Sequence, residues 1–405
     1  MTAKRVLLGE VADFYAGSSL PEGEDWCSQE GGYLLARVSD MNRSGNEKYI
    51  LTAQQWNSVP GQKSATCPGG AVVIPKRGGA IGTNKKRIVQ RAAVLDPNLM
   101  AVRPHEDVLD LDYLYQWFLT VDLEQLASGS SVPQLNKKDL APLSVPLPSL
   151  TEQQRIAAVL DQVDALRAKR REAIALLDDL TWSVFLDTFG DPASNPNGWR
   201  QCEFGEAILD GPQNGLYKPA GDYGGGVPIL RIDSFRAGEL KPYLQWRRVN
   251  ASVLEQERYG LRKFDIVINR VNSRSHLGKC VIVGEVAEGA VFESNMMRVR
   301  VDPSIVRPTF IERYLQTRFA RKQILESAKD AVNQSSVNQR DIRGLLVFVP
   351  PMNMQCKFEE FLEEIREHQR KHRAHLDVLD ELFTSLRHRA FSGTLWDHET
   401  TGEAA

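Results

Sequence analysis

The chain repeats itself, and the repeat includes a segment with the apolar pattern of a long helix. Residues 151–191 and 353–393 align without a gap. In the first segment, apolar residues follow the three–four spacing of a heptad seam: Ile156, Val159, Val163, Leu166, Ala173, Leu177, Leu180 and Val184. The second segment places Phe358, Phe361, Ile365, Leu379, Leu382 and Leu386 at matching positions. This pattern predicts two long helices with apolar seams, and the duplication predicts two-fold pseudo-symmetry of the kind used to bind a bipartite partner.

The repeat extends beyond the two helical segments. Matching runs recur in the same order in both halves: 8–10 with 204–206, 32–38 with 226–232, 98–103 with 295–300, and 135–140 with 337–342. Each half ends in a proline-rich strand before its helix, and proline disfavours continuation of regular structure. The sequence therefore predicts an α+β fold of two pseudo-symmetric mixed α/β domains, joined by two long helices packed as an antiparallel intramolecular coiled coil. The expected segments are domains at 1–148 and 192–350, helices at 149–191 and 351–393, and a polar tail at 394–405.

Composition limits the class of protein. The chain has 405 residues, of which 42% are hydrophobic and 25% charged, as is typical of soluble globular proteins with two or three domains. No apolar run approaches the roughly 18 residues that span a bilayer. Five scattered cysteines without a C-x-x-C pair favour a reducing cytoplasm, without disulfides or structural zinc. We expect a cytoplasmic protein with no membrane association.

Motifs for the common catalytic chemistries are absent from the sequence. It contains no G-x-x-x-x-G-K-[ST] phosphate loop, no G-x-S-x-G and no H-E-x-x-H. The N/D-P-P-aromatic signature of adenine methyltransferases is also missing. Without a phosphate loop, the sequence does not encode ATP-driven work in this chain.

Basic residues gather in one loop of each half, although the net charge is only −2. The first loop contains Lys76, Arg77, Lys85, Lys86, Arg87 and Arg91, and the second contains Arg262, Lys263, Arg270, Arg274, His276 and Lys279 together with Asn272. Such side chains can reach DNA phosphates, and Arg and Asn can recognise guanine and adenine in the major groove. A single loop of this kind would be interpreted as ordinary solvated charge. Its recurrence in both halves favours binding to double-stranded DNA.

A second polar segment also recurs. It comprises Ser130, Ser131, Gln134 and Asn136 in the first half and Ser335, Ser336, Asn338 and Gln339 in the second. Asn136 and Asn338 could equally cap the short helices that follow them. Arg37 and Arg231 recur at strand ends, where a structural ion pair is the simpler explanation. The candidate DNA-binding residues are Lys76, Arg77, Lys85, Lys86, Arg87, Ser130, Gln134, Asn136, Arg270, Asn272, Arg274, His276, Lys279, Ser335 and Asn338.

The predicted seams have a polar middle. Arg170 lies there in the first helix, and His368, His372 and His375 lie there in the second. Histidines at i, i+4 and i+7 can bind zinc, but no carboxylate or cysteine occupies an obvious fourth position. A polar contact that fixes the helix register is the favoured explanation.

The first helix resembles a known family. Residues 146–156, with the sequence PLPSLTEQQRI, look like the start of the conserved helix in specificity subunits of type I restriction–modification systems. Residues 165–173 and 189–192 continue the resemblance, and 195–199 resemble the entry to the second half. The second copy departs from the pattern, because residues 353–357 are NMQCK where the first copy has TEQQR.

The resemblance implies a non-catalytic DNA-binding subunit with two target-recognition domains. Such a subunit recruits two adenine methyltransferase subunits, and two motor–nuclease subunits complete the restriction enzyme. The partners use S-adenosylmethionine, ATP and Mg²⁺. The helices would then act as a spacer between two different half-sites. Two alternatives remain: a coiled-coil interaction scaffold whose globular domains bind protein, and, less favoured, a nuclease.

Overall fold

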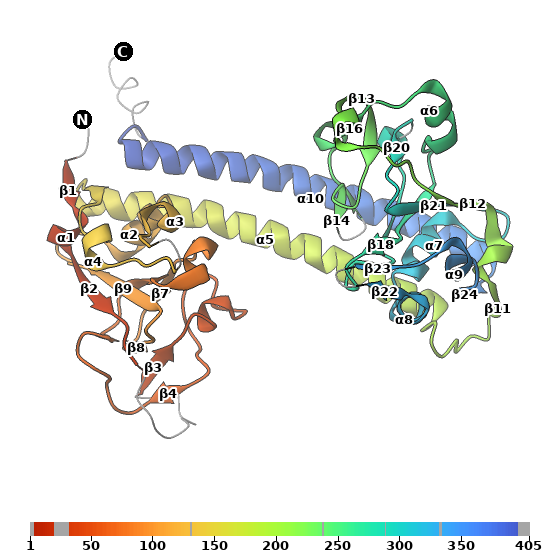
Figure 1. The fold of residues 1–405 in the computed structure, drawn as a ribbon. Coiled ribbons are helices and arrows are strands. Elements are labelled where there is room, and N and C mark those ends of the chain that lie inside the picture. Colours follow the sequence, from red (N-terminus) through yellow and green to blue (C-terminus); the bar gives the residue numbers. More distant parts are fainter. Residues whose placement is uncertain are drawn as a thin grey trace, which may run out of the picture. The chain divides into compact units, whose positions relative to one another are not determined.

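The computed structural model describes residues 4–19, 32–129, 132–236, 239–287, 289–331 and 334–395. The chain divides into two compact units. Unit 1 comprises residues 1–172 and 373–405, and unit 2 comprises residues 173–372. Two long helices, α5 (Leu150–Phe189) and α10 (Met352–Ser392), each contribute to both units (Figure 1). The predicted α+β class with two long packed helices is confirmed, and no described helix is both long and apolar enough to cross a membrane.

The described residues of unit 1 form two four-stranded sheets and one strand pair. Its strands are β1 (Arg5–Leu7), β2 (Ala12–Ala16), β3 (Tyr33–Ala36), β4 (Trp56–Asn57), β5 (Thr66–Cys67), β6 (Ala71–Pro75), β7 (Arg87–Val89), β8 (Ala93–Leu95), β9 (Leu99–Pro104) and β10 (Ser144–Pro146). Its short helices are α1 (Leu8–Val11), α2 (Leu111–Phe118), α3 (Leu123–Leu126) and α4 (Lys137–Leu140), with 3₁₀ turns at Asp40–Asn42 and Gly78–Thr83. The sheet orders are β2-β9-β6-β7 and β4-β3-β8-β5, and β1 pairs with β10. Every residue of β6 is buried, as expected for a central strand.

Unit 2 repeats this plan and adds small sheets. Its strands are β11 (Arg200–Glu203), β12 (Ile208–Asn214), β13 (Tyr223–Leu230), β14 (Phe235–Arg236), β15 (Glu239–Leu240), β16 (Arg248–Val249), β17 (Ile266–Asn269), β18 (Val271–Asn272), β19 (Cys280–Ile282), β20 (Val291–Phe292), β21 (Met296–Val301), β22 (Lys329–Ala331), β23 (Gln334–Ser336) and β24 (Leu346–Val349). Its helices are α6 (Val253–Tyr259), α7 (Pro308–Leu315), α8 (Arg318–Ser327) and α9 (Gln339–Arg343). Four 3₁₀ turns complete the unit: Phe204–Ala207, Ala220–Asp222, Tyr243–Gln245 and Glu285–Ala287.

The strand orders show the internal symmetry. The main sheet of unit 2 runs β12-β21-β17-β19, which matches β2-β9-β6-β7 of unit 1 strand for strand. The parallel pair β3–β8 matches the parallel pair β13–β20. The antiparallel pair β1–β10 matches the antiparallel pair β11–β24. In each pair the first strand precedes the globular part of its half and the second strand follows it. The repeat seen in the sequence is therefore a repeat of topology.

Aromatic side chains attach the long helices to unit 2. Phe185 and Phe189 of α5, Phe310 of α7 and Phe358 of α10 are all fully buried. The Phe189 ring lies 4.9 Å from that of Phe310 and 5.2 Å from that of Phe358, both in edge-on geometry. Each ring also removes a large apolar area from water, so this cluster joins the three helices.

A buried glutamine anchors the start of α5 to the rest of unit 1. The Gln153 amide oxygen accepts a hydrogen bond of 2.8 Å from the Asp110 backbone N–H. The Gln153 amide nitrogen donates to the carbonyls of Val108 and Pro148, both at 3.0 Å. The Gln153 side chain is fully buried. Its amide therefore satisfies three backbone groups at a position that water does not reach.

The same arrangement recurs in unit 2. Gln355, the repeat equivalent of Gln153, accepts from the Arg307 N–H at 2.7 Å and donates to Pro350 at 2.8 Å and Ile305 at 3.3 Å. It is also fully buried. We call Gln153 and Gln355 the anchor glutamines.

Polar contacts between α5 and α10 occur at equivalent positions in the two units. In unit 1, Arg167 Nε lies 2.5 Å from Asp380 Oδ1. In unit 2, Gln369 Nε2 donates to Asp178 Oδ1 at 2.7 Å. The repeat places Gln369 on Arg167 and Asp380 on Asp178, so one contact occurs twice. The polar contact that fixes register was predicted at Arg170 and at His368, His372 and His375, whereas these two contacts are formed by other residues, Arg167 with Asp380 and Gln369 with Asp178.

The structure corrects one part of the predicted seam. Ile156 and Val163 of α5 are buried as expected. Leu166 and Leu180 of α5 are more than 40% exposed, and so is Leu382 of α10, the repeat equivalent of Leu180. The polar contacts occupy the inner face at this level of the helices. The leucines one or two residues along from these polar side chains are largely exposed to solvent.

We expect replacement of an anchor glutamine to destabilise its unit. Gln153→Ala leaves three buried backbone groups unpaired, and the free energy of unfolding should fall by about 3 kcal/mol. The neighbouring exposed Gln154→Ala is the matched control, with an expected change below about 0.5 kcal/mol. Scanning calorimetry of the full chain measures both. Equal melting curves for the two variants would contradict the anchoring role.

Candidate nucleic-acid interface

In each unit, the structure brings the predicted basic loop and the predicted polar segment together. In unit 1, the Leu135 N–H donates to the carbonyl of Lys76 at 2.8 Å. In unit 2, the Val337 N–H donates to the carbonyl of Arg270 at 3.0 Å. These are repeat-equivalent bonds, and both follow directly after a central buried strand, β6 or β17. Two separate sequence signals thus form one surface in each half.

The surface of unit 1 surrounds a polar pocket of 180 Å³. Its lining residues are Gly17, Lys76, Arg77, Pro97, Gln134, Leu135 and Asn136. The Arg77 guanidinium is exposed. With the Gln134 amide oriented so that its oxygen faces Arg77, the guanidinium donates two hydrogen bonds of 3.1 Å to that oxygen. Lys76 Nζ donates to the Gly17 carbonyl at 3.0 Å. The pKa of Lys76 is lowered mainly by burial and also by the nearby positive charge of Arg77. Arg77 and Gln134 therefore offer a preformed set of donors and acceptors at the protein surface.

Lys86 contributes to the interior of unit 1. Its side chain is only 2% exposed, and its ammonium donates to Asn84 Oδ1 at 2.6 Å and to the Val121 carbonyl at 2.7 Å. Burial lowers the pKa of Lys86 to about 8, although the nearby Asp122 carboxylate raises it. A buried ammonium cannot contact a DNA phosphate, so we leave Lys86 out of the proposed surface.

Arg87 and Lys85 also make contacts within the unit. The Arg87 guanidinium donates to the Lys86 carbonyl at 2.8 Å and to the Met41 carbonyl at 3.0 Å. Burial lowers the pKa of Arg87. Lys85 is partly exposed and its ammonium donates to the Asn42 amide oxygen. Lys85 and Arg87 are both partly exposed, in contrast to the buried Lys86.

Arg270 occupies the place of Lys76 in unit 2 and makes a similar internal contact. Its guanidinium donates to the Ser294 carbonyl at 2.8 Å, and burial lowers its pKa. Both residues thus tie the loop to the neighbouring chain segment. Their partial exposure still leaves one face of each cation at the surface.

The remaining candidates of unit 2 lie on one small sheet and its adjoining loop. Strand β18, which includes Asn272, pairs with β23, which includes Ser335, and β23 pairs with β22. Arg274 Nη1 lies 2.5 Å from Asp330 Oδ2. His276 is exposed, and its Nδ1 lies near the hydroxyls of the two neighbouring serines. Lys279 is partly buried at the end of the loop.

The two asparagines cap helices, as one of the two open alternatives predicted. Asn338 Oδ1 accepts from the N–H groups of Arg340 and Asp341 at 2.8 and 3.1 Å, and Asp341 in turn accepts from the Asn338 N–H. In unit 1 the Asn136 N–H donates to Asp139 Oδ2 at 2.7 Å, which is the same reciprocal arrangement. Both asparagines are exposed, so capping does not remove them from the surface. Ser130 and Ser131 lie outside the described residues.

The recurring arginines at strand ends have structural partners. Arg231 Nε lies 3.3 Å from the carboxylate of Glu293, whose pKa is raised by burial. In unit 1, Arg37 donates to the amide oxygen of Gln55. The structural ion pair is therefore confirmed in unit 2, and a neutral partner replaces it in unit 1.

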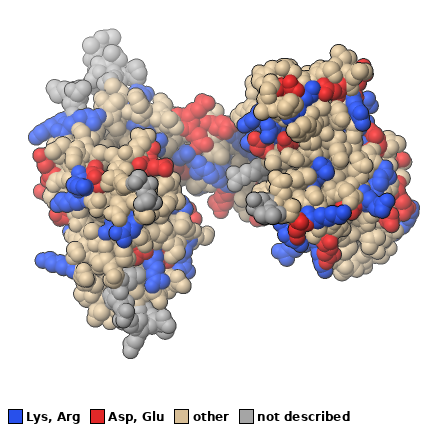
Figure 2. Space-filling view, in the orientation of Figure 1, with Lys and Arg blue, Asp and Glu red and all other residues tan. Residues whose placement is uncertain are grey.

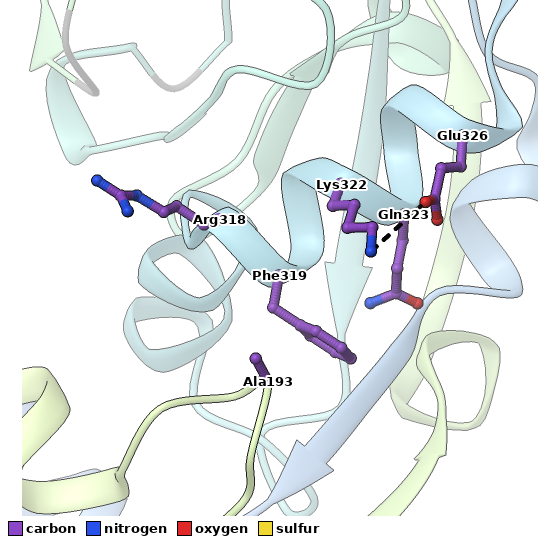
Figure 3. Close-up of a pocket in the computed structure, with 6 residues that line it drawn as sticks. All are labelled: Ala193, Arg318, Phe319, Lys322, Gln323 and Glu326. Atoms are coloured by element: carbon purple, nitrogen blue, oxygen red, sulfur yellow. Dashed lines mark ion pairs between the residues drawn. The ribbon is translucent and has the colours of Figure 1, made fainter.

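Helix α8 carries a basic surface that the sequence analysis missed. A pocket of 360 Å³ is lined by Ala193, Arg318, Phe319, Lys322, Gln323 and Glu326 (Figure 3). Phe319 points toward Ala193, and Lys322 lies 3.8 Å from Glu326. The Gln323 amide donates to and accepts from the backbone of Leu346, which fixes α8 against strand β24.

The same helix contacts the predicted basic loop. Arg321 donates to the Ser275 carbonyl at 3.2 Å, and Arg274 donates to the Leu325 carbonyl at 3.4 Å. Helix α8 is therefore held against the loop, and Arg318 and Lys322 are exposed on that helix. The sequence signal that could have revealed this basic helix is the close spacing of Arg318, Arg321 and Lys322. Figure 2 shows that basic side chains are interspersed with acidic ones, so the positive surfaces are local.

The possible metal site on α10 finds no support in the geometry. Among the residues that the structure describes, no group of three or more His, Cys, Asp or Glu side chains is placed to hold a metal ion. His368, His372 and His375 fall within the described part of the helix.

Comparisons with known proteins agree with the repeated architecture. The family model for the type I restriction modification DNA specificity domain matches residues 3–176. The StySPI specificity subunit of Salmonella potsdam is 25% identical over 65% of this chain and 60% of its own length. The EcoKI specificity subunit of Escherichia coli K12 is 25% identical over 60% of this chain and 55% of its own length. The matched region thus spans less than two thirds of either relative.

A solved structure shares the fold. The S subunit of a type I restriction–modification system from M. genitalium superposes with a TM-score of 0.58 over 96% of this chain and 99% of that chain. The sequence identity is 14%, so this likeness concerns the fold alone.

We expect Lys86 to make the stability of unit 1 depend on pH. Its folded pKa of about 8 lies below the value of 10.5 for an exposed lysine. Between these values the unfolded chain binds more protons, so the stability of the wild type should rise with pH by roughly 3 kcal/mol relative to Lys86→Met. Urea unfolding from pH 7.5 to 10.5 measures this. Lys85→Met reports the loss of a neighbouring charge, and parallel curves for the wild type and Lys86→Met would contradict the prediction.

Proposed function

The chain belongs to the specificity (S) subunit family of type I restriction–modification systems, and we propose that it recognises a bipartite double-stranded DNA target with one half-site on each unit. In this proposal residues 1–148 and 192–350 are the target-recognition domains. The chain acts in the cytoplasm, carries out no chemistry and binds no cofactor of its own.

The observation that carries the proposal is the duplicated surface. In both units a basic loop leaves a central strand and is hydrogen-bonded at its first residue to a second polar segment, by equivalent bonds. One such loop could be ordinary surface charge. Two at equivalent positions in a pseudo-symmetric chain match the geometry of a DNA target with two half-sites.

The two surfaces differ in chemistry, which favours two different half-sites. Unit 1 presents Arg77 beside Gln134, a guanidinium and an amide that can pair with guanine and adenine edges. Unit 2 presents Arg274 on the loop and Arg318 and Lys322 on α8. A target composed of two unlike halves need not be a palindrome.

The long helices would set the separation of the half-sites. Helix α5 has 40 residues, which corresponds to about 60 Å at 1.5 Å per residue. Half-sites one turn of DNA apart are separated by roughly 34 Å. The register contacts of Arg167 with Asp380 and of Gln369 with Asp178 would keep this spacing constant.

Exposed apolar positions on the helices support the binding of two copies of one partner. Leu176 and Val378 are repeat equivalents with 60% and 63% exposure, and Leu180 and Leu382 are repeat equivalents with 43% each. Each unit thus carries one apolar pair one helical turn long. We propose that each pair contacts one adenine methyltransferase subunit, which supplies S-adenosylmethionine, and that two motor–nuclease subunits, which use ATP and Mg²⁺, join that complex.

We expect the complex with its methyltransferase partner to methylate adenines in a bipartite motif with a fixed gap. Arg77→Ala should weaken DNA binding by about 10- to 100-fold and relax the motif in one half only, because one reader of base edges is lost. Arg103→Ala, at the opposite end of strand β9, removes the same charge and is the control. Sequencing of methylated genomic DNA and binding titrations measure both effects.

Three results would contradict the proposal. Binding without salt dependence would favour the interaction scaffold, since phosphate contacts always weaken as salt rises. Magnesium-dependent cleavage by the isolated chain would indicate a nuclease. Equal motifs for the wild type and Arg77→Ala would remove Arg77 from the DNA surface.

We expect acidic substitutions at the exposed helix positions to release partner copies one at a time. Leu176→Asp with Leu180→Asp, or Val378→Asp with Leu382→Asp, should leave one methyltransferase per chain, and the fourfold variant should leave none. Leu254→Asp, at an exposed leucine of α6, is the control and should retain two. Native mass spectrometry measures the stoichiometry. Two bound copies in the fourfold variant would place the partner elsewhere.

A further inference from the structure

An ion pair lies within the predicted DNA surface of unit 2. Arg274 Nη1 is 2.5 Å from Asp330 Oδ2, and both side chains are more than half exposed. The other oxygen of this carboxylate accepts a hydrogen bond of 2.6 Å from the Ser335 hydroxyl. Because Ser335 is buried on the adjacent strand β23, Asp330 is fixed in place beside the arginine.

Cations lie on the helix beside this pair, together with the Glu326 carboxylate, which is 3.8 Å from Lys322. The loop that carries Arg274 lies against α8, where Arg321 donates to the Ser275 carbonyl. Arg318 and Lys322 on the same helix are exposed. A DNA backbone attracted by these cations would therefore approach Arg274 with the Asp330 carboxylate in its path.

Unit 1 has a different arrangement at the equivalent place. The repeat aligns Asp330 with Ser128, whose backbone pairs with that of Gln134. The arginine of that surface, Arg77, is hydrogen-bonded to the neutral amide of Gln134. The guanidinium of unit 1 thus has a neutral partner, whereas the charge of that in unit 2 is offset by a carboxylate.

We propose that Asp330 is a specificity-determining residue that restrains phosphate binding by Arg274. This inference rests on the proposed DNA recognition. Phosphate contacts carry no sequence information and supply most of the affinity for arbitrary DNA. Arg274 must leave Asp330 before it can neutralise a phosphate, and the carboxylate repels that phosphate. Asp330 therefore lowers the affinity of unit 2 for non-cognate duplexes, while base contacts made elsewhere on the surface are retained.

The test is a gain of binding. Asp330→Asn in the full chain should bind a short random-sequence duplex about three- to tenfold more tightly than the wild type. The slope of log K against log salt should become steeper by about 0.9, the value for one added phosphate contact. Glu285→Gln is the matched control, because it removes one negative charge from an exposed pair with Lys263 at the opposite end of strands β17 and β19.

A double variant separates the local effect from a change in net charge. The chain with both Arg274→Ala and Asp330→Asn should bind no more tightly than Arg274→Ala alone. Equal affinities for Asp330→Asn and Glu285→Gln would overturn the inference, as would a gain that persists without Arg274. Asp330→Ser, which introduces the residue found in unit 1, should give the same gain and covers the case in which the asparagine variant unfolds. A wild-type chain without salt-dependent binding would contradict the proposed function itself.

Discussion

The anchor glutamines are the contacts on which the placement of each globular part depends. A proline-rich strand leads into each long helix, and nothing in such a connection fixes the direction of the helix by itself. Gln153 and Gln355 supply that direction, because each amide satisfies three backbone groups from segments on both sides of the connection. Rotation of the globular part would leave these groups buried and unpaired. Hydrogen bonds are directional, so they fix an orientation that apolar packing alone would leave adjustable.

The second constraint is the register between the helices. Apolar seams can slide by a turn at little cost, because one leucine replaces another. The contacts of Arg167 with Asp380 and of Gln369 with Asp178 cannot slide in this way, since a shift would leave a largely buried polar group without its partner. The internal repeat provides the contact twice, once in each unit. The anchors and the register contacts together hold each globular part and its stretch of the two long helices in one arrangement within its unit.

The sequence was sufficient for the parts of the fold that depend on local pattern. Heptad spacing predicted α5 and α10, and capping of the helix that follows Asn338 was one of the two alternatives left open for that residue. It was insufficient where the deciding contact is distant along the chain. The burial of Lys86 depends on the Val121 carbonyl, and the partner of Arg274 is Asp330, neither of which a charge pattern reveals. The departure of residues 353–357 from the first copy concealed that Gln355, the repeat equivalent of Gln153, is retained there.

The pattern of what is repeated and what differs has a physical reason. The strand order, the anchors, the register contacts and the bond that joins each loop to its polar segment occur in both units, because each satisfies buried groups that tolerate no substitution without cost. The side chains that project from this frame differ, as Arg77 with Gln134 and Arg274 with Asp330 show. Exposed ion pairs and amide contacts contribute little to stability, so they can change freely without loss of the fold. A chain built in this way can alter the exposed chemistry of either unit without loss of the contacts that hold the fold of that unit.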